Sequence, residues 1–531
     1  MTETGPAGFR QRSVTEVRAD LLERREVALL DVREEGPFAL AHPLFAASLP
    51  LGRIELEVLD RVPRLTAPIV VYDDGEGLAG RAAARLTALG YSDVALLEGG
   101  LSGWRAQGAE LFRDVNVPSK AFGELVEARR HTPSIGPEEL DAKVRAGANV
   151  IVLDARRFEE YQTMSIPSAT SVPGGELVLR VRDLAPDPAT LVVVNCAGRT
   201  RSIIGAQSLV NAGVPNAVAA LRNGTIGWTL AGLPLDQGRT RRFGAVSPPM
   251  LEASRTAARD IAERAGVRRV DRGTLEAWSN DAARTLYRFD VRTPGEYETG
   301  HLRGFRSAPG GQLVQETDVF APVRGARLVL ADDDGVRAHM AASWLAQMGW
   351  DAFVLEESTA GDLDRGAFQP QRPPLPDAAR IRPEELARLA AGDGATLIDF
   401  GPSRQYEAGH VPGAWWVLRS QAEKIPLAAG PERPIVLISP DGDLAAYAAG
   451  EVGAITGHRP LVLDGGSAAW AAGGRPLERG PTRQLSPAID AYQRPYEGTD
   501  NPREAMQGYL DWEFGLVAQL ERDGSHHFRV V

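Results

Sequence analysis

The sequence contains four copies of one pattern, and this repeat constrains the fold more than any other feature. Each copy has a short apolar run, a small loop and a helix-forming stretch that ends at a glycine. When the copies are aligned on this run, the residue that follows the strand, here called the anchor, is Asp73, Cys196, Asp332 or Ser439. The closing glycines Gly90, Gly213, Gly349 and Gly457 follow their anchors by 17, 17, 17 and 18 residues. The spacing indicates one fold repeated four times.

Two further markers keep the same register. An aspartate that ends another apolar strand precedes the anchors by 42, 42, 42 and 40 residues: Asp31, Asp154, Asp290 and Asp399. A tryptophan follows three of the anchors by 31, 32 and 31 residues: Trp104, Trp228 and Trp470. The third copy departs from this last marker and reads "LEESTAGD". Because strands alternate with helices over about 105–115 residues, each copy predicts a small parallel-sheet α/β domain flanked by helices.

A chain of 531 residues is too long for one hydrophobic core. The repeat divides it into units one to four, at residues 13–115, 132–236, 266–368 and 380–480. The connection between units two and three is expected to contain a helix, and the proline-rich one between units three and four is expected to be extended. Residues 481–531 form a C-terminal extension outside the repeat, called the tail here.

The tail has the pattern of a helix. Asn501 is the expected N-cap, Pro502 occupies the first turn and Gly524 ends the helix. An apolar stripe runs along it, formed by Tyr509, Leu510, Phe514, Val517 and Leu520. Packing on a neighbouring domain is the simpler interpretation, and a homodimer contact is the alternative.

The composition of the chain argues against several classes of function. The net charge of −11 argues against a general nucleic-acid or membrane surface. No apolar run approaches the roughly 18–20 residues of a membrane span, and the N-terminus lacks an apolar signal core. One cysteine cannot form an intramolecular disulfide. We therefore expect a cytoplasmic protein, with no metal and no cofactor.

That single cysteine, Cys196, lies where chemistry is expected. A lone cysteine is often only a small buried hydrophobe. Here a β-branched strand, 191–194, precedes it and a helix follows, so the thiol lies at the carboxyl edge of a predicted parallel sheet. Ligands bind at that edge in open α/β sheets. The position favours a functional thiol.

The ordered motifs resemble those of the rhodanese (thiosulfate sulfurtransferase) family over about residues 13–480. "DVRTPGEYETGHLRGF" and "GPSRQYEAGHVPGA" resemble the family's strand end and Gly-His turn, "CAGRTRS" its active-site loop, and "EGGLSGW" its closing turn. Unit two departs at the turn and reads "MSIPSA". The histidines of this turn in the other units, His42, His301 and His410, are expected to be structural.

The resemblance implies sulfur transfer through Cys196. The thiolate would take the outer sulfur of an anionic donor such as thiosulfate, and cyanide or a small thiol would accept it. The residues expected to bind the substrate are Ala197, Gly198, Arg199, Thr200, Arg201 and Ser202 in the loop, together with Arg156. The helix start and Arg199 and Arg201 favour the thiolate. Arg156 has the alternative of pairing with a carboxylate, which the sequence slightly favours.

Aspartate or serine at the other three anchors cannot carry a transferable sulfur, so units one, three and four are expected to be inactive. Two-domain rhodaneses place an inactive unit before an active one, which predicts that units one and two pair, and units three and four likewise. A non-catalytic scaffold or a sulfur-carrier binding protein is the alternative function. A phosphatase is a weaker one, because such loops need Cys-x5-Arg and this loop has Cys-x4-Arg.

Overall fold

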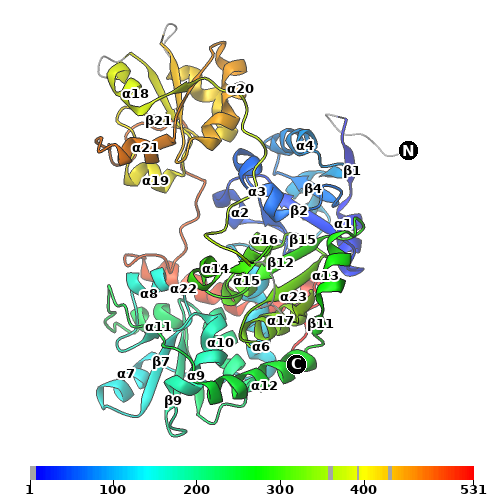
Figure 1. The fold of residues 1–531 in the computed structure, drawn as a ribbon, viewed down its shortest axis with the longest axis vertical. Coiled ribbons are helices and arrows are strands. Elements are labelled where there is room, and N and C mark those ends of the chain that lie inside the picture. The colour runs from blue at the N-terminus through cyan, green and yellow to red at the C-terminus, as the bar shows by residue number, and fades with distance from the viewer. Residues whose placement is uncertain (1–7, 357–362, 391–393, 429–432) are drawn as a thin grey trace.

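Each of the four units contributes five parallel strands to a sheet, in agreement with the predicted parallel-sheet domains, and β15 (Val323–Arg324) of unit three adds an antiparallel strand to the sheet of unit one (Figure 1). The structure is a computed structural model that describes residues 8–356, 363–390, 394–428 and 433–531. Most of the motif "LEESTAGD" in unit three lies outside these residues. Val192 and Val194 of unit two contact one apolar cluster, whereas Val193 contacts another. Helices therefore cover both faces of the sheet, which explains why its strands are continuously apolar.

The strands have the same order in every unit, and the strand before the anchor is always central. The sheet orders are β1-β5-β4-β2-β3, β6-β10-β9-β7-β8, β11-β17-β16-β12-β14 and β19-β23-β22-β20-β21, and in the first of these sheets β2 also pairs antiparallel with β15 of unit three. Unit one contains β1 (Arg10–Arg12), β2 (Val27–Asp31), β3 (Ala47–Ser48), β4 (Ile69–Tyr72) and β5 (Val94–Leu97). Unit two contains β6 (Ser134–Ile135), β7 (Val150–Asp154), β8 (Thr170–Ser171), β9 (Leu191–Asn195) and β10 (Val218–Leu221). Unit three contains β11 (Arg268–Val270), β12 (Leu286–Asp290), β13 (His301–Leu302), β14 (Arg306–Ser307), β15 (Val323–Arg324), β16 (Arg327–Ala331), β17 (Asp351–Leu355) and β18 (Leu363–Asp364). Unit four contains β19 (Arg380–Ile381), β20 (Thr396–Asp399), β21 (Trp415–Trp416), β22 (Ile435–Ile438) and β23 (Leu461–Leu463).

The helices follow the same plan. Unit one has α1 (Val14–Leu22), α2 (Glu35–Leu40), the 3-10 helix η1 (Leu51–Arg53), α3 (Ile54–Arg61), α4 (Leu78–Ala88) and α5 (Gly100–Ala106), and α6 (Val117–Arg130) leads to unit two. Unit two has α7 (Pro137–Arg145), α8 (Phe158–Thr163), η2 (Gly174–Glu176), α9 (Leu177–Leu184), α10 (Thr200–Asn211) and α11 (Gly224–Leu230), and α12 (Pro248–Arg264) leads to unit three. Unit three has α13 (Arg272–Ser279), α14 (Pro294–Thr299), α15 (Gly310–Gln315), α16 (Thr317–Phe320) and α17 (Arg337–Gln347). Unit four has α18 (Pro383–Ala390), α19 (Ser403–Ala408), η3 (Arg419–Leu427), α20 (Asp443–Thr456) and α21 (Gly466–Ala472). The tail has α22 (Arg503–Phe514) and α23 (Leu516–Asp523).

The repeat markers have the same structural role in each copy. All four helix-ending glycines have positive φ, between +59° and +96°, which other residues rarely adopt. The indole N–H of Trp104, Trp228 and Trp470 donates in each case to the carbonyl oxygen six residues further along. The three turn histidines are buried and bond backbone carbonyls, in agreement with a structural role.

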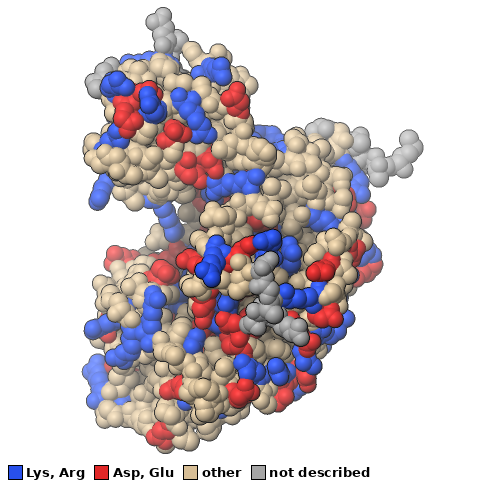
Figure 2. Space-filling view, in the orientation of Figure 1, with Lys and Arg blue, Asp and Glu red and all other residues tan. Residues whose placement is uncertain are grey.

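The units do not pair in the order that the resemblance implied. Gly175 of unit two lies against Gly311 of unit three, where an added Cβ on Gly175 would come within 3.0 Å of the Gly311 nitrogen. The equivalent turns of units one and four also meet, and the guanidinium of Arg419 bonds both carboxylate oxygens of Glu55 at 2.9 and 3.0 Å. Units two and three, and units one and four, are therefore the pairs joined by equivalent turns. Figure 2 shows unit four separated from unit two by an open gap, with acidic and basic side chains interspersed on that face.

The tail differs from its prediction in two details. Its helix starts after Pro502, which takes the N-cap position expected for Asn501, and it breaks at Gly515 into α22 and α23. Gly524 ends it as expected, with φ of +61°. Leu516 and Leu520 enter the core of unit one, whereas Tyr509 and Leu510 pack on Ile226 of unit two. Helices α22 and α23 thus connect units one and two. No helix of the described residues combines the length and apolarity that crossing a membrane requires.

Candidate active site

Cys196 follows the central strand β9 and precedes α10, at the predicted sheet edge. Its side chain is only 1% exposed. Sγ lies 3.4 Å from the hydroxyl oxygen of Ser202, which itself donates to the Arg199 carbonyl at 2.8 Å. Ser202 also contacts the sulfur through its backbone N–H. The sulfur therefore lies inside a tight turn at the start of a helix.

The loop is held in place by the start of α11. The backbone N–H groups of Thr225 and Ile226 donate to the carbonyls of Cys196 and Ala197 at 2.9 and 3.0 Å. Gly224, the first residue of this helix, has φ of +54°, and an added Cβ would lie 2.3 Å from the Cys196 carbonyl oxygen. Only glycine allows this approach. The closing-turn motif therefore fixes the shape of the cysteine loop.

The electrostatic surroundings of Cys196 differ from the prediction. Burial raises the pKa of the thiol above its usual value, while Arg201 and then Ser202 oppose that change and Glu513 adds to it. The sequence predicted that the helix start and two arginines would favour the thiolate. Of those two arginines, Arg201 is the one that acts on the sulfur, and desolvation outweighs it in this enclosed site.

Both loop arginines are held by carboxylates. Arg201 forms a bidentate pair with Glu160 of α8, at 2.7 and 2.9 Å. Arg199 pairs with Glu124 and Glu127 of α6 and donates to the Asn223 side chain. Burial alone would raise the pKa of Glu160, but Arg201 lowers it to about 2. An anionic donor would therefore meet arginines whose charge is already partly balanced.

Arg156 takes its alternative role, which is to pair with a carboxylate. Its guanidinium bonds both carboxylate oxygens of Asp154 at 2.9 and 2.7 Å, and the Met164 carbonyl at 2.6 Å. The side chain is 1% exposed. These hydrogen bonds support the strand end and the following turn, so the guanidinium of Arg156 is already occupied. This arrangement differs from the expectation that Arg156 contacts the substrate.

The remaining loop residues lie against other parts of the chain. Ala197 is buried, and Ser202 contacts Sγ as described. Gly198 faces the tail, where an added Cβ would lie 3.0 Å from Tyr509 Cε1 and 3.2 Å from Glu513 Oε2. The Thr200 hydroxyl lies 3.5 Å from Glu513 Oε1. The cysteine loop is thus covered by α22, which sequence reasoning placed only on some neighbouring domain.

Several residues around the loop were not predicted at all. Lys120 of α6 is buried, bonds Asp114 at 2.7 Å and lies over the rings of Tyr496, Tyr509 and Trp512. Burial alone would lower the pKa of Lys120, but Asp114 raises it above its usual value. One signal was available: this is one of only three lysines in a chain with many arginines. The sequence around Lys120 does not indicate that this residue lies beside the tail.

Two cavities lie near the loop. One, of about 220 Å³, lies between α11 and the tail and is lined by Thr225, Ile226 and Tyr496. The other, of about 50 Å³, is lined by Thr200 and Arg201 and by the glycine turns where units two and three meet. Cys196 lines neither cavity. Within the described ranges, no group of three or more His, Cys, Asp or Glu side chains is arranged to hold a metal ion.

The other three anchors occupy their own loops. Asp73 accepts hydrogen bonds from the N–H groups of Gly75, Leu78 and Ala79. Asp332 accepts from Gly335 at 3.0 Å and from Ala338 at 2.8 Å. Ser439 accepts from Ala445 at 3.2 Å. The N–H group six residues after the anchor is a donor in each case, as in the Cys196 loop. These loops therefore bind their own anchor side chain.

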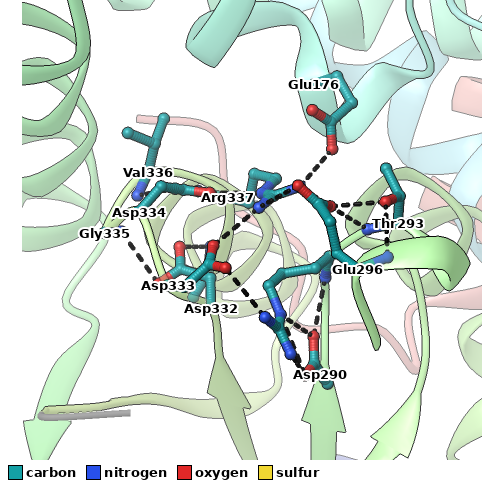
Figure 3. Close-up of polar contacts among 12 residues, drawn as sticks. Glu176, Asp290, Thr293, Glu296, Asp332, Asp333, Asp334, Gly335, Val336 and Arg337 are labelled. Atoms are coloured by element: carbon teal, nitrogen blue, oxygen red, sulfur yellow. Dashed lines mark hydrogen bonds and ion pairs between the residues drawn. The ribbon is translucent and has the colours of Figure 1, made fainter. Parts of the chain in front are cut away.

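Unit three adds a dense acidic cluster (Figure 3). Arg337 bonds Asp333 and Asp334 of its own loop, Glu296 of α14 and Glu176 of unit two. Burial, and then Asp334, raise the pKa of Asp332 to about 8. Arg337 is consequently surrounded by carboxylates, and Arg292 also pairs with Asp333 of this loop.

Comparison with known proteins agrees with this architecture. The sequence profile of the Rhodanese-like domain matches residues 13–107, 136–231, 273–361 and 382–473. The chain belongs to the rhodanese family and carries four copies of its domain.

Individual relatives include enzymes of this family. A crystal structure of a thiosulfate sulfurtransferase from Pseudomonas aeruginosa is 62% identical, with a TM-score of 0.97, and the match covers 98% of this chain and 99% of that one. A curated thiosulfate sulfurtransferase from the same organism is 32% identical over 26% of this chain and 58% of its own length. One from Azotobacter vinelandii is 29% identical over 26% of this chain and 52% of its own. The chain thus spans little more than half the length of these two curated relatives.

Proposed function

We propose that this protein is a sulfurtransferase in which Cys196 carries sulfane sulfur as a persulfide. Relatives that are thiosulfate sulfurtransferases support sulfur transfer in general. The observation that carries the assignment is the shared loop geometry. The N–H group six residues after the anchor faces a carboxylate in units one and three and a thiol in unit two. A loop that binds a carboxylate suits a thiolate or persulfide anion equally well.

The reaction proposed is a double displacement. The Cys196 thiolate attacks the outer sulfur of thiosulfate, a new Sγ–S bond forms, and the donor's S–S bond breaks with its electron pair leaving on sulfite. Cyanide or a thiolate then attacks the outer sulfur of the persulfide. The Sγ–S bond breaks, its electron pair returns to Cys196, and thiocyanate or a small persulfide departs. The N–H groups at the start of α10 stabilise the anion at both stages.

The surrounding charges set conditions for this chemistry. The buried thiol must lose its proton before attack, and the positive charge of Arg201 favours that loss. Glu160 holds Arg201 by two hydrogen bonds and so fixes the position of its charge. We assign Arg201 to electrostatic stabilisation of the sulfur anion. Arg199, which faces α6, has a positioning role.

Mass spectrometry of peptides from the treated protein tests the proposal. Incubation with thiosulfate should add about 32 Da, one sulfur atom, to the peptide that contains Cys196, and cyanide should remove it. Thiocyanate should form in step with that loss. No added mass with either thiosulfate or 3-mercaptopyruvate would overturn the enzyme assignment and leave the scaffold alternative. Hydrolysis of a phosphate monoester without sulfur loading would favour the phosphatase.

A further inference from the structure

The tail places a carboxyl group at the cysteine loop. Glu513 of α22 is fully buried, and its Oε2 lies 3.2 Å from the position of a Cβ on Gly198. Its Oε1 accepts a hydrogen bond from the Tyr509 hydroxyl at 2.8 Å and contacts the Thr200 hydroxyl at 3.5 Å. Oε2 has no hydrogen-bond partner among the described residues. A buried polar atom beside the proposed nucleophile is thus left without a partner, which native proteins rarely tolerate without a purpose.

Charged and titratable groups face Glu513 from three elements. Tyr509 lies one turn earlier on α22, and Arg199 lies at the start of α10. Helix α6 contributes Glu124, which is paired with Arg199, and Lys120, which is paired with Asp114. Cys196 also interacts with the carboxyl electrostatically. Among the residues that the structure describes, both nearby cations are therefore shared with other carboxylates, and Glu513 has no dedicated counter-ion.

The protonation state follows from these contacts. Burial, and then the Glu124 carboxylate, raise the pKa of Glu513 to about 8, with Lys120 opposing. At neutral pH the carboxyl group is mostly protonated. Because Oε1 already accepts the Tyr509 proton, the acid proton belongs on Oε2, on the side of the loop. A carboxylic acid kept neutral by its surroundings can act as a hydrogen-bond donor to an anion.

We propose that Glu513 is part of the sulfur-donor site, where its protonated carboxyl group donates a hydrogen bond from Oε2 to an oxygen of the anionic donor bound at Cys196. The inference rests on the proposed function. The Glu513 proton stays in place throughout the transfer, so the bonds formed and broken are those of the double displacement. Ionisation of Glu513 removes the donor hydrogen, repels the anionic substrate and disfavours the Cys196 thiolate.

The pH dependence of kcat/KM for thiosulfate, with cyanide as acceptor, tests this role in the full-length protein. In the wild type, kcat/KM should stop rising near pH 8 and then fall. Glu513→Gln keeps the shape of the side chain and supplies a neutral N–H donor. At pH 7 the kcat/KM of Glu513→Gln should remain within about threefold of the wild-type value. It should then continue to rise as the thiol ionises, and near pH 9.5 it should exceed the wild-type value by more than about tenfold. Glu513→Ala, which has no donor, should lose at least about tenfold at pH 7.

Glu504→Gln is the matched control, since it removes the same charge from an exposed position of the same helix. It should reproduce the wild-type profile. A wild-type profile that keeps rising above pH 8 would overturn the donor role without any variant. Parallel pH profiles for wild type and Glu513→Gln would also overturn the donor role. So would a loss of kcat/KM at pH 7 in Glu513→Gln that is as large as the loss in Glu513→Ala. Sulfur loading of Cys196, measured by mass in the same samples, separates the two proposals. Normal loading with a contrary pH profile overturns only the Glu513 role, whereas no wild-type loading at any pH overturns both.

Discussion

Units two and three have the same loop scaffold but different anchors. Each loop follows the central strand of a sheet with the same strand order. Each has an arginine five residues after the anchor, paired with a glutamate on the helix after the Asp-Arg strand end: Arg201 with Glu160, and Arg337 with Glu296. Units one and four have leucine at the arginine position, Leu78 and Leu444. Unit three has therefore kept part of the electrostatic frame of the proposed active unit.

The difference lies in what the loop surrounds. In unit two the anchor is a thiol with one arginine near it, whereas in unit three the anchor is Asp332, with Asp333 and Asp334 next to it. The Asp332 carboxyl occupies the N–H groups that a sulfur anion would need. Retention of the fold and of an arginine–glutamate pair thus does not preserve the proposed chemistry. The charge inside the loop distinguishes the two units.

The largest effect is expected from Cys196→Ser. A hydroxyl group is close in size to a thiol but cannot carry sulfane sulfur, so turnover should fall by about 10³-fold or more. Thermal unfolding should change little, because the loop keeps its backbone hydrogen bonds. Thiocyanate formation and the melting temperature measure the two effects. Turnover near the wild-type rate would place the chemistry elsewhere in the chain.

Restoring a thiol in unit three should not restore activity. In the double variant Cys196→Ser with Asp332→Cys, Asp333 and Asp334 remain beside the new thiol, and Arg337 remains bound to carboxylates. Adjacent negative charge raises a thiol pKa and repels thiosulfate. Activity should stay below about a tenth of wild type, which corresponds to at least about 1.4 kcal/mol in activation free energy. Higher activity in the thiosulfate–cyanide assay would show that unit three lost only its nucleophile.

Arg201→Ala and Arg337→Ala form a matched pair that separates catalysis from stability. Loss of Arg201 should lower kcat/KM for thiosulfate by about 10²–10³-fold, because a charge that stabilises the sulfur anion is removed. It should also lower the unfolding free energy by roughly 2–4 kcal/mol, since Glu160 loses its partner. Arg337→Ala should destabilise the protein at least as much and leave kcat/KM near the wild-type value. A fall in kcat/KM for both variants would mean that stability alone explains the loss.

The ion pair between Arg201 and Glu160 also predicts that the stability of the protein depends on pH in the acid range. The pKa of Glu160 is lowered to about 2 in the folded state from an ordinary value of 4.5, so its pairing stabilises the protein fully above about pH 4.5. That contribution is lost as pH falls from about 4.5 towards 2. The stability difference between wild type and Arg201→Ala should shrink over that range in urea unfolding experiments. A constant difference would contradict the paired state of Glu160.

The smallest effect is expected from Ser202→Ala. The equivalent position holds alanine in the three other units, Ala79, Ala338 and Ala445, and serine only beside the cysteine. The variant removes the hydroxyl contact with Sγ but keeps the backbone N–H, so kcat/KM should fall by less than about tenfold. The pH at which the thiol reacts with iodoacetamide should rise slightly. A loss comparable to that of Arg201→Ala would make the hydroxyl a major determinant of the site.

The sequence by itself determined the four units, their parallel sheets and the position of Cys196 at a sheet edge. These features depend on local patterns: apolar runs, a glycine with positive φ after each helix, and tryptophan and aspartate at repeated offsets. Such patterns act within about a hundred residues, and a fourfold repeat makes them visible in a single chain. The loop geometry follows from the same local rules.

The tertiary structure alone decided what surrounds Cys196 and which units pair. Glu513 lies more than three hundred residues from Thr200 in sequence yet contacts it, and Lys120 approaches the same loop side from the connection before unit two. Side-chain burial also reversed an expectation, because desolvation outweighs Arg201 at the thiol. Burial and charge pairing depend on which surfaces meet in space, and no local pattern encodes the docking of the tail. Sequence patterns can therefore locate the proposed nucleophile, but only the packed chain defines the electrostatic surroundings in which it would react.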